Sequence, residues 1–375
     1  MIVCVFWSSL ALVGYAYLGY PLLARLLART LGNAPRQDET TPDVTVVIAA
    51  RNEAGRIAAR IGNIFEQDYP REKLHVLVVS DGSCDGTETA ARIDASVRVI
   101  ALAENAGKAV ALNAALDEVS TDFVVFTDAR QRFAPDALRR LLAAFADPAV
   151  GAVSGELEIV EDFEHPAQAS IGLYWRIEKS LRESEALLSW LHGVSGAVYA
   201  LRTKLFRAMP AGTILDDMWV PLQVIRAGQR VWMARDAIAY DIASSDAKTE
   251  FRRKTRTLAG NWQLIVRMPW LMNPLRNPVF FAWFSHKFLR LLVPWALLGA
   301  WLASAAAGGS YRAAFGLQTL CYLAAVAALL APRLAARVPL LPTAGTFLML
   351  NAAAFVSLPA WLRLQHDPQR LWKKG

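Results

Sequence analysis

The sequence predicts an α/β domain with a mostly parallel sheet, flanked by long apolar segments at both ends of the chain. Short apolar, β-branched runs at residues 44–50, 74–79 and 123–126 are typical of buried strands, and 97–102 is a weaker fourth. Helical patterns lie between these runs, at residues 57–65, 87–93, 109–116 and 137–145. Strands that alternate with helices favour parallel pairing through crossover connections.

Composition separates a soluble middle from two apolar ends. The 375 residues suffice for one large domain with additions, and 54% of them are hydrophobic. The mean hydropathy of +0.27 is high for a soluble protein but too low for a chain that is membrane throughout. The net charge of +7 suits an anionic cytoplasmic membrane surface. No long basic block with interleaved aromatic residues is present, so we expect no nucleic-acid partner.

The three cysteines, Cys4, Cys84 and Cys321, have no paired spacing. This spacing predicts neither a disulfide framework nor a CxxC metal site, and it fits a reducing compartment.

Residues 1–24 carry no charge and predict a transmembrane helix, followed by a juxtamembrane linker at 25–43. A cleaved signal peptide would have a basic start and a shorter apolar core, and neither is present. Arg25 and Arg29 follow the apolar run directly. Basic residues mark the cytoplasmic side of a membrane helix, so we expect the following domain in the cytoplasm.

The C-terminal region, residues 279–362, predicts two or three transmembrane helices. Its uncharged runs are 291–311, 313–332 and 338–362. Crossings by all three runs would place the basic tail at 363–375 outside, whereas its charges favour the inside. The alternative is that one of these runs is a re-entrant or interfacial segment. Before this region, residues 261–278 mix Trp, Arg and Pro. They predict an amphipathic interface segment broken near Pro269 or Pro274, with a plain linker as the alternative.

Acidic residues follow three of the predicted strands. Glu53 comes after the first strand, Asp81 and Asp85 after the second, and Asp128 after the strand at 123–126. Ligands of parallel sheets bind at the carboxyl ends of the strands. Four acids in one crevice would repel one another, which indicates a divalent cation with a phosphate ligand, although Asp85 is also a natural helix cap. No GxxxxGK[ST] or GxGxxG follows the first strand, which argues against a P-loop or a dinucleotide-redox site.

Seven ordered segments resemble the family 2 glycosyltransferases, which have the GT-A fold. They are VVIAARNE (46–53), VVSDGSCDGT (78–87), NAGKAVALN (105–113), FTDAR (126–130), GVSGAVYALR (193–202), LDDMWVPL (215–222) and RRKTRT (252–257). Each segment alone is weak, whereas the ordered set is specific. The resemblance covers about 44–262 and implies a GT-A glycosyltransferase domain at 44–260.

The resemblance implies a donor site. Ala50, Glu53 and Asp81 would hold the uracil and ribose of a nucleotide, with Lys108 nearby. Asp128 begins the family's DxD motif, which binds the donor and a Mg²⁺ or Mn²⁺ ion that bridges its diphosphate. The third position of that motif is Arg130 rather than Asp. Asp128 would then be the metal ligand, or Arg130 would offset part of the diphosphate charge itself.

The resemblance also implies an acceptor side. Asp217 ends the family's acidic acceptor motif and would be the general base. Its neighbour Asp216 cannot point the same way on a helix or a strand. Arg253 and Arg256 lie where membrane-bound synthases carry Q(Q/R)xRW, a phosphate- and acceptor-side element. That motif ends here in Thr257 instead of Trp, which argues against processive elongation. The basic cluster at 252–256 is equally typical of positive-inside flanking charge.

Two further features lie near this side. Residues 167–188 form an amphipathic, helical pattern that we place in the acceptor half near the membrane. Gly193 and Gly196 suggest a tight bend beneath the acceptor or diphosphate, or an ordinary turn. His192 precedes them, and a lone histidine is more often structural.

These observations predict an integral membrane glycosyltransferase of the hexosyltransferase type (EC 2.4) that inverts the sugar, with a cytoplasmic domain at a bacterial inner membrane. The expected donor is a UDP-sugar rather than a GDP-sugar, and the acceptor is a hydroxyl of a lipid-linked glycan or polysaccharide. Transfer onto polyprenyl phosphate and a catalytically inactive membrane scaffold are the alternatives. An integral transporter is disfavoured, because the soluble middle carries the acid clusters.

Overall fold

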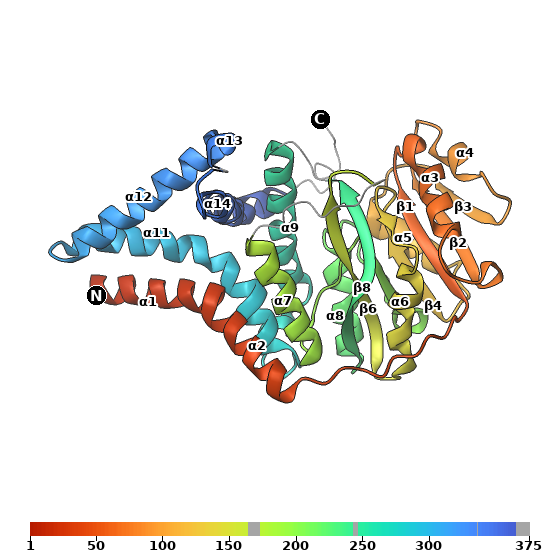
Figure 1. Cartoon of the computed structure of the whole chain (residues 1–375), viewed down its shortest axis with the longest axis horizontal. Coiled ribbons are helices and arrows are strands. Elements are labelled where there is room, and N and C mark those ends of the chain that lie inside the picture. The colour runs from red at the N-terminus through yellow and green to blue at the C-terminus, as the bar shows by residue number, and fades with distance from the viewer. Residues whose placement is uncertain (164–172, 243–246, 336, 365–375) are drawn as a thin grey trace.

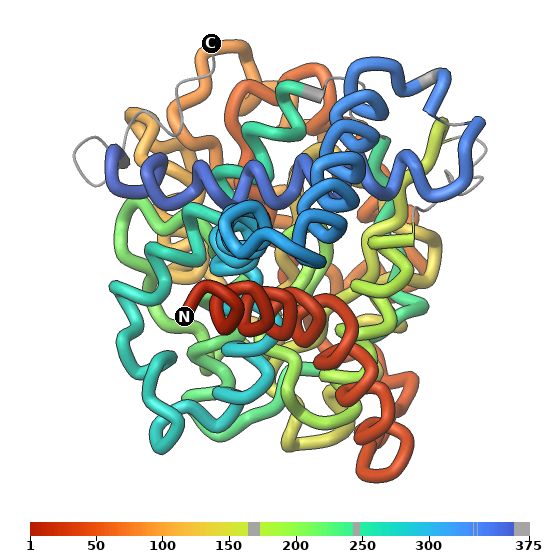
Figure 2. Tube along the Cα trace, turned by 90° about the vertical axis from the view of Figure 1, so that its left-hand side faces the viewer, coloured from red at the N-terminus to blue at the C-terminus, as the bar shows by residue number. Residues whose placement is uncertain are grey.

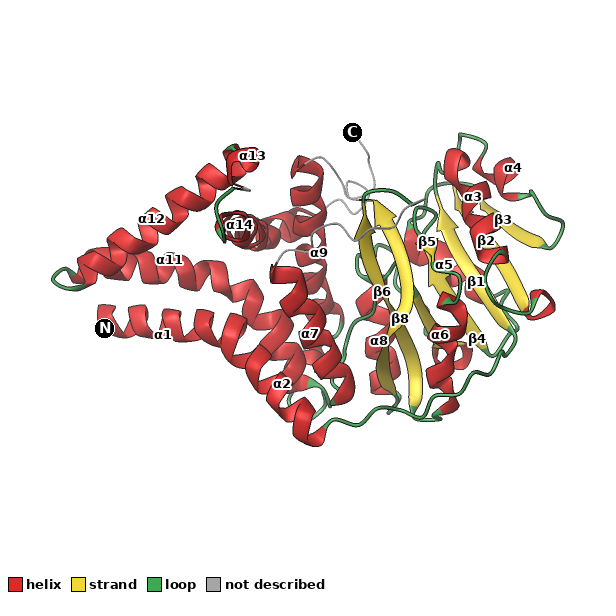
Figure 3. Ribbon diagram, viewed as in Figure 1, coloured by secondary structure: helices red, strands yellow, loops and turns green. Residues whose placement is uncertain are grey.

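The computed structural model describes residues 1–163, 173–242, 247–335 and 337–364. An eight-stranded sheet lies at its centre, in the order β3-β2-β1-β4-β7-β6-β8-β5 (Figure 3). The strands are β1 (Val44–Ala50), β2 (Leu74–Asp81), β3 (Val97–Leu102), β4 (Phe123–Thr127), β5 (Arg132–Phe133), β6 (Val150–Val160), β7 (Tyr199–Arg202) and β8 (Arg230–Ile242). The first four pair in parallel, as do β6 and β8, while β7 is antiparallel to β4 and β6. The predicted mostly parallel sheet is confirmed.

The four predicted strands and the four predicted helical patterns all form. The helices of the sheet domain are α3 (Ala54–Phe65), α4 (Thr87–Ala91), α5 (Lys108–Leu116), α6 (Ala137–Ala143) and α8 (Asp216–Arg226). Short 3₁₀ turns occur at Arg71–Lys73, Ala144–Ala146, Thr203–Leu205 and Pro269–Met272. β1 is buried along almost its whole length, because parallel strands are covered on both faces.

The sequence did not predict β5 to β8. β6 contains Gly151 and Gly155 and ends in alternating acids, which interrupts the apolar run that marks a buried strand. β8 carries Arg235 and Asp236 in its middle, both exposed. These strands form because they pair with one another along most of their length, which is a tertiary effect.

Four helices are long and apolar enough to cross a membrane: Ile2–Leu31, Phe280–Ala307, Tyr311–Leu330 and Leu341–Arg363. They comprise α1 (Ile2–Gly14), a π-helical turn (Tyr15–Gly19), α2 (Tyr20–Leu31), α10 (Phe280–Trp283), a second π-helical turn (Phe284–Phe288), α11 (Leu289–Ala307), α12 (Tyr311–Leu330) and α14 (Leu341–Leu364), with the short α13 (Pro332–Ala335) before the last. The first helix runs beyond residue 24, so the predicted linker at 25–43 is wrong in its first part. Apolar leucines between Arg25 and Arg29 continue the helix as far as Leu31.

The long helices α1, α11 and α12 project from one side of the sheet domain (Figure 1). Figure 2 looks at this side and shows α14 crossing behind α12, with α1 lying below both. Between the long helices and the sheet lie α2, α7 (Leu173–Leu187) and α9 (Ala247–Arg267). One hydrophobic core extends from the sheet to Val279 and Trp283. The two parts therefore pack as one body at this junction.

The predicted interface segment begins inside α9, so no structural boundary exists at residue 260. α9 ends at Arg267, and a 3₁₀ turn starts at Pro269, where the sequence predicts a break. The predicted helix at 167–188 corresponds to α7. Residues 167–172 and most of the basic tail lie outside the described residues.

Candidate active site

The carboxyl ends of β1, β2 and β4 meet at one edge of the sheet. Ala50 pairs with Ser80 in the register, and Ile48 pairs with Thr127. Gly82 follows β2 with a φ of +60°, and a Cβ there would lie 2.4 Å from the main-chain nitrogen of Asn105. Only glycine allows both this backbone and this approach. The loops at 80–86 and 104–107 are therefore in direct contact.

Asp81 fixes the loop that leads into α5. Its carboxylate accepts hydrogen bonds from the main-chain N–H of Ala106 (2.7 Å) and of Gly107 (3.0 Å). The side chain is buried. Asp81 therefore sets the direction of the first residue of α5, which is Lys108.

Asp85 holds the starts of two helices, α3 and α4. Glu53 lies at the N-cap position of α3, and its Oε2 pairs with Arg56 at 3.1 Å. Asp85 accepts hydrogen bonds from the N–H groups of Ala54 (3.1 Å) and Thr87 (3.0 Å). These bonds lower the pKa of Asp85, with the hydroxyl of Thr87 contributing most. The contacts of Asp85 are therefore those of a helix cap, the alternative given for this residue from the sequence.

The four acids therefore do not require a bound cation to offset their repulsion. Each one has a partner within the protein: an arginine for Glu53, main-chain amides for Asp81 and Asp85, and a lysine for Asp128. Sequence spacing does not reveal these donors, so the repulsion between the acids does not by itself predict a bound cation.

Lys108 joins the two sides of the site. Its Nζ lies 3.0 Å from Oδ1 of Asp128 and 3.1 Å from Oδ2 of Asp216. Burial opposes the charge, but the two carboxylates raise the pKa of Lys108 above its ordinary value. The lysine is therefore a fixed cation between the donor motif and the acceptor motif.

Asp217 lies beside the Lys108 bridge with its carboxylate free. A Cβ on Gly196 would lie 3.6 Å from Cβ of Asp217, and the main-chain oxygen of Asp217 accepts a hydrogen bond from Val194 N–H (2.9 Å). Within the described residues, its carboxylate has no hydrogen-bond or ion-pair partner. Burial and then the charge of Asp216 raise the pKa of Asp217 to about 7, while Lys108 opposes the shift. A carboxylate that titrates near neutrality is suited to accept a proton.

Gly193 packs closely against the residue after Asp217. A Cβ on Gly193 would lie 2.5 Å from the sulfur of Met218. Asp216 and Asp217 are the first two residues of α8, and they point in different directions, as predicted for neighbours on a helix. Asp216 pairs with Lys108, and Asp217 lies against the bend at 193–196.

Arg130 turns towards β8. Its Nη2 lies 3.8 Å from Oδ2 of Asp241, which also accepts a hydrogen bond from Gln131 (2.9 Å). Asp241 is an acid at this edge that sequence reasoning missed. Its position at the end of a strand could have identified it, but the sequence did not predict that strand.

Arg60 on α3 is a second missed residue. It is buried, donates to the Thr127 hydroxyl at 2.8 Å, and lies 3.9 Å from the ring centroid of Phe133. Burial lowers the pKa of Arg60 to about 9, and the charge of Asp128 opposes this shift. No sequence signal separates this arginine from a solvent-exposed helix residue.

Arg253 and Arg256 are exposed on α9 and take no part in the Lys108 ion pairs. Arg253 pairs with Glu250 of the same helix at 3.4 Å. α9 nevertheless contacts the acceptor motif, because Gly260 lies against Leu215 and the Gln263 side chain accepts a hydrogen bond from Ile214 N–H (2.9 Å). α9 thus packs against the loop that leads into Asp216 and is hydrogen-bonded to it.

A Mg²⁺ or Mn²⁺ ion would have one suitable carboxylate in this site. Asp128 is partly exposed, and only one of its oxygens is held by Lys108. Magnesium is often held by one or two carboxylates together with substrate phosphates. The residues therefore fit an ion that the donor diphosphate helps to hold, with Arg130 and Lys108 adding positive charge.

The parallel edge, the donor-side acids and the adjoining acidic pair define the class of protein: a GT-A glycosyltransferase. The profile described as "Glycosyl transferase family 2" matches residues 45–209. This stretch of the chain is similar to the family 2 glycosyltransferases. The matched residues include the predicted donor set and end before Asp216 and Asp217.

A solved structure supports the fold along the whole chain. It is a mannosyltransferase from Pyrobaculum calidifontis in complex with GDP-Man and Mn²⁺, with a TM-score of 0.72 and 27% sequence identity. The match covers 96% of this chain and 99% of the mannosyltransferase. The GT-A fold predicted from the sequence is confirmed.

Curated relatives are similar to part of the chain. An N-acetylglucosaminyltransferase from Rhizobium meliloti is 28% identical over 242 residues, which are 59% of this chain and 56% of the relative. A pre-mycofactocin glycosyltransferase from Mycobacterium tuberculosis is 28% identical over 242 residues, 61% of this chain and 48% of the relative. The match thus spans about half the length of these relatives.

Proposed function

We propose that this protein transfers a sugar, with inversion, from a nucleotide-diphosphate sugar to a hydroxyl of a membrane-associated glycan or glycolipid. The observation that carries this proposal is the Lys108 bridge. It holds Asp128, the donor-side carboxylate, and Asp216, the neighbour of the proposed base, within ion-pair distance of one cation.

In the proposed reaction, the acceptor hydroxyl attacks the anomeric carbon as the bond to the nucleoside diphosphate breaks. Asp217 accepts the hydroxyl proton, and its pKa of about 7 makes it a base at neutral pH. Lys108 and Arg130 stabilise the negative charge that grows on the leaving diphosphate. A divalent ion held by Asp128 would add charge stabilisation to the same group.

The donor site is proposed to comprise Ala50, Glu53 and Asp81 for the nucleoside. Asp81 acts through the loop at 105–107, because its carboxylate is already bound to main-chain amides. We retain a UDP-sugar as the expected donor. The GDP-Man of the structural relative makes GDP-sugars the first alternative to test.

The acceptor is proposed to approach from the membrane side. α7 and α9 separate the long apolar helices from the sheet, and α9 clamps the loop before Asp216 (Figure 1). Arg182 of α7 and Lys287 of the π-helical turn both lower the pKa of Asp217, so cations lie near the base. These cations also suit polyprenyl phosphate, the second candidate acceptor, which needs no base because it is already an anion.

We propose a cytoplasmic catalytic domain on the basis of Arg25 and Arg29. α14 crosses α12 (Figure 2) and packs against α9 beside the sheet domain, as an interfacial helix would. With Ile2–Leu31, Phe280–Ala307 and Tyr311–Leu330 as the crossings, two of them after the sheet domain, the basic tail would lie on the same side as that domain, which removes the conflict between charge and span count. Cysteine labelling of the tail in sealed inverted vesicles tests this arrangement.

A donor screen tests the function itself. Purified membranes are incubated with UDP- and GDP-sugars, with and without Mn²⁺, and transfer and hydrolysis are measured. We expect one donor to be turned over. Nucleotide-sugar binding without turnover would indicate the inactive scaffold, and transfer that survives loss of Asp217 would indicate polyprenyl phosphate.

A further inference from the structure

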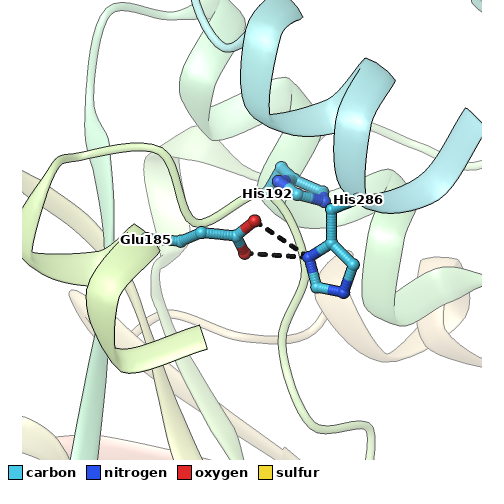
Figure 4. Close-up of side chains that lie close together, drawn as sticks. All are labelled: Glu185, His192 and His286. Atoms are coloured by element: carbon cyan, nitrogen blue, oxygen red, sulfur yellow. Dashed lines mark hydrogen bonds and ion pairs between the residues drawn. The ribbon is translucent and has the colours of Figure 1, made fainter. Parts of the chain in front are cut away.

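A second cluster of ionisable groups lies at the junction between the sheet domain and the membrane helices (Figure 4). It consists of Glu185 on α7, His192 on the loop after α7, and His286 on the π-helical turn Phe284–Phe288. Their exposed fractions are 0%, 1% and 1%. The segment that carries Glu185 and His192 and the distant segment that carries His286 thus bring two imidazoles and a carboxylate together away from solvent.

The ligand atoms of the three side chains lie within 4.8 Å of one another. Nδ1 of His286 is 2.9 Å from Oε1 of Glu185 and 3.1 Å from Oε2. Two ligands with bonds of about 2.1 Å to one tetrahedral ion lie roughly 3.4 Å apart. The Glu185–His286 pair needs to open by only a few tenths of an ångström to hold an ion.

His192 offers a lone pair with nothing to bind. Its Nδ1 lies 3.0 Å from the main-chain oxygen of Trp190, so this nitrogen carries the hydrogen. Its Nε2 is buried and, within the described part of the chain, has no hydrogen-bond partner. A buried imidazole nitrogen without a donor is unusual, and it is the form that binds metals.

The other ligands already have outer partners. Nε2 of His286 lies 2.8 Å from Oε1 of Glu178, and the Tyr20 hydroxyl donates to Oε1 of Glu185 at 2.8 Å. A carboxylate behind a histidine fixes the tautomer and orientation of a metal-binding imidazole. The carbonyl of Trp190 does the same for His192.

We propose that Glu185, His192 and His286 bind a zinc ion that ties the membrane helices to the acceptor side of the domain. Two imidazoles and one carboxylate are a ligand set of Zn²⁺, whereas Mg²⁺ and Mn²⁺ prefer oxygen ligands. A water molecule or the Tyr20 hydroxyl would complete four-fold coordination. The site is separate from the donor-side ion of Asp128.

The charged side chains around the cluster define the arrangement expected without a metal. Glu178 and Glu185 face Lys287 and Arg290, whose nearest atoms lie 3.9 Å and 2.7 Å from Glu178. Without a metal, a His286 ring with hydrogens on both nitrogens would donate to both carboxylates, and its Nε2 also lies 3.4 Å from Nζ of Lys287. With a metal, the ion replaces the hydrogen on Nδ1, and Nε2–H still donates to Glu178. The competing arrangement is therefore a protonated His286 in an ion-pair network.

The ion would connect directly to the candidate active site. His192 precedes the bend at 193–196, and Val194 N–H on this bend binds the main-chain oxygen of Asp217. His286 lies on a helix that continues into α11. The zinc would thus fix the position of Asp217 relative to the membrane, through two residues that do not touch the substrate.

The test is the metal content of the full-length protein, purified in detergent with a tag that contains no histidines. Mass spectrometry of the metals should find close to one zinc per chain. His192→Ala and Glu185→Gln should lose it, with Zn²⁺ affinity reduced by more than about tenfold. His75→Ala, at an exposed position of β2, is the matched control and should keep the zinc, as should Asp128→Asn.

A readout independent of retained zinc comes from Zn²⁺ and Co²⁺ added to the metal-stripped protein. Zn²⁺ should raise the thermal midpoint, and Co²⁺ should give the visible absorption of a tetrahedral site, with neither effect in His192→Phe, which keeps the ring volume. Zinc-free protein that gives neither response would overturn the proposal in favour of the ion-pair network. Equal zinc in the wild type and in both His192 variants would overturn it as well.

Discussion

The donor half and the acceptor half of the site handle their acidic residues in opposite ways. On the donor half, Asp81 and Asp85 are bound to main-chain amides of neighbouring loops, and Glu53 is bound to an arginine one helical turn away. On the acceptor half, Asp217 has no partner for its carboxylate within the described residues, and its pKa is raised to about 7. Acids that shape a binding loop are satisfied, whereas the acid assigned to proton transfer is left available.

Removal of the unpartnered acid, Asp217, is the most direct test of this difference between the two halves. Asp217→Asn should reduce kcat by at least about a hundredfold and leave donor binding nearly unchanged, because the base acts only in the chemical step. Single-turnover kinetics and nucleotide-sugar binding measure the two effects. Asp236→Asn changes an exposed acid of β8 and should retain activity. Near-normal turnover in Asp217→Asn would remove the assignment.

The pH profile tests the same acid without changing it. Only the ionised form of Asp217 accepts a proton, so kcat/KM should rise about tenfold per pH unit below 7 and level off above it. Lys108 lowers the pKa of Asp217, so Lys108→Met should move the inflection to higher pH. An inflection near pH 4 would show that Asp217 has an ordinary pKa or a different role.

Two glycine substitutions test whether the contact between α9 and the loop before Asp216 positions that loop. A Cβ on Gly260 would lie 2.5 Å from Cγ of Leu215, so Gly260→Ala should displace the loop before Asp216 and lower stability by about 1–3 kcal/mol. Gly62→Ala on α3 meets nothing within 4 Å and should be neutral or stabilising by up to about 1 kcal/mol. Thermal unfolding and kcat of both variants are compared. Equal effects would show that α9 does not position the motif.

Arg130 gives the smallest expected effect. Arg130→Asp restores the second acid of the family's DxD motif and should increase the apparent affinity for Mn²⁺ severalfold, while activity without metal falls severalfold. Titration of transfer activity with Mn²⁺ measures both. Arg207→Asp makes the same charge change beyond β7, away from the donor edge, and should do neither. An unchanged Mn²⁺ titration in Arg130→Asp would mean that this position does not face the diphosphate.

The donor half could be predicted largely from sequence, because its strands and its acidic residues follow one another closely along the chain. β1, β2 and β4 are short apolar runs, and each acid lies directly after the strand that positions it. The acceptor half was predicted less well. β6 and β8 carry glycines and charges, so neither shows the apolar run of a buried strand, and Asp241 was missed together with its strand.

The sequence by itself determined the mostly parallel sheet, the order of the motifs and the presence of apolar helices at both ends, because each depends on local patterns of residues. Only the tertiary structure decided which acids are satisfied, that Lys108 joins Asp128 to Asp216, and that His192 and His286 meet at Glu185. These features arise where distant segments pack together and exclude water. Partners and burial set the ionisation of each group, and neither can be read from the spacing of residues along the chain.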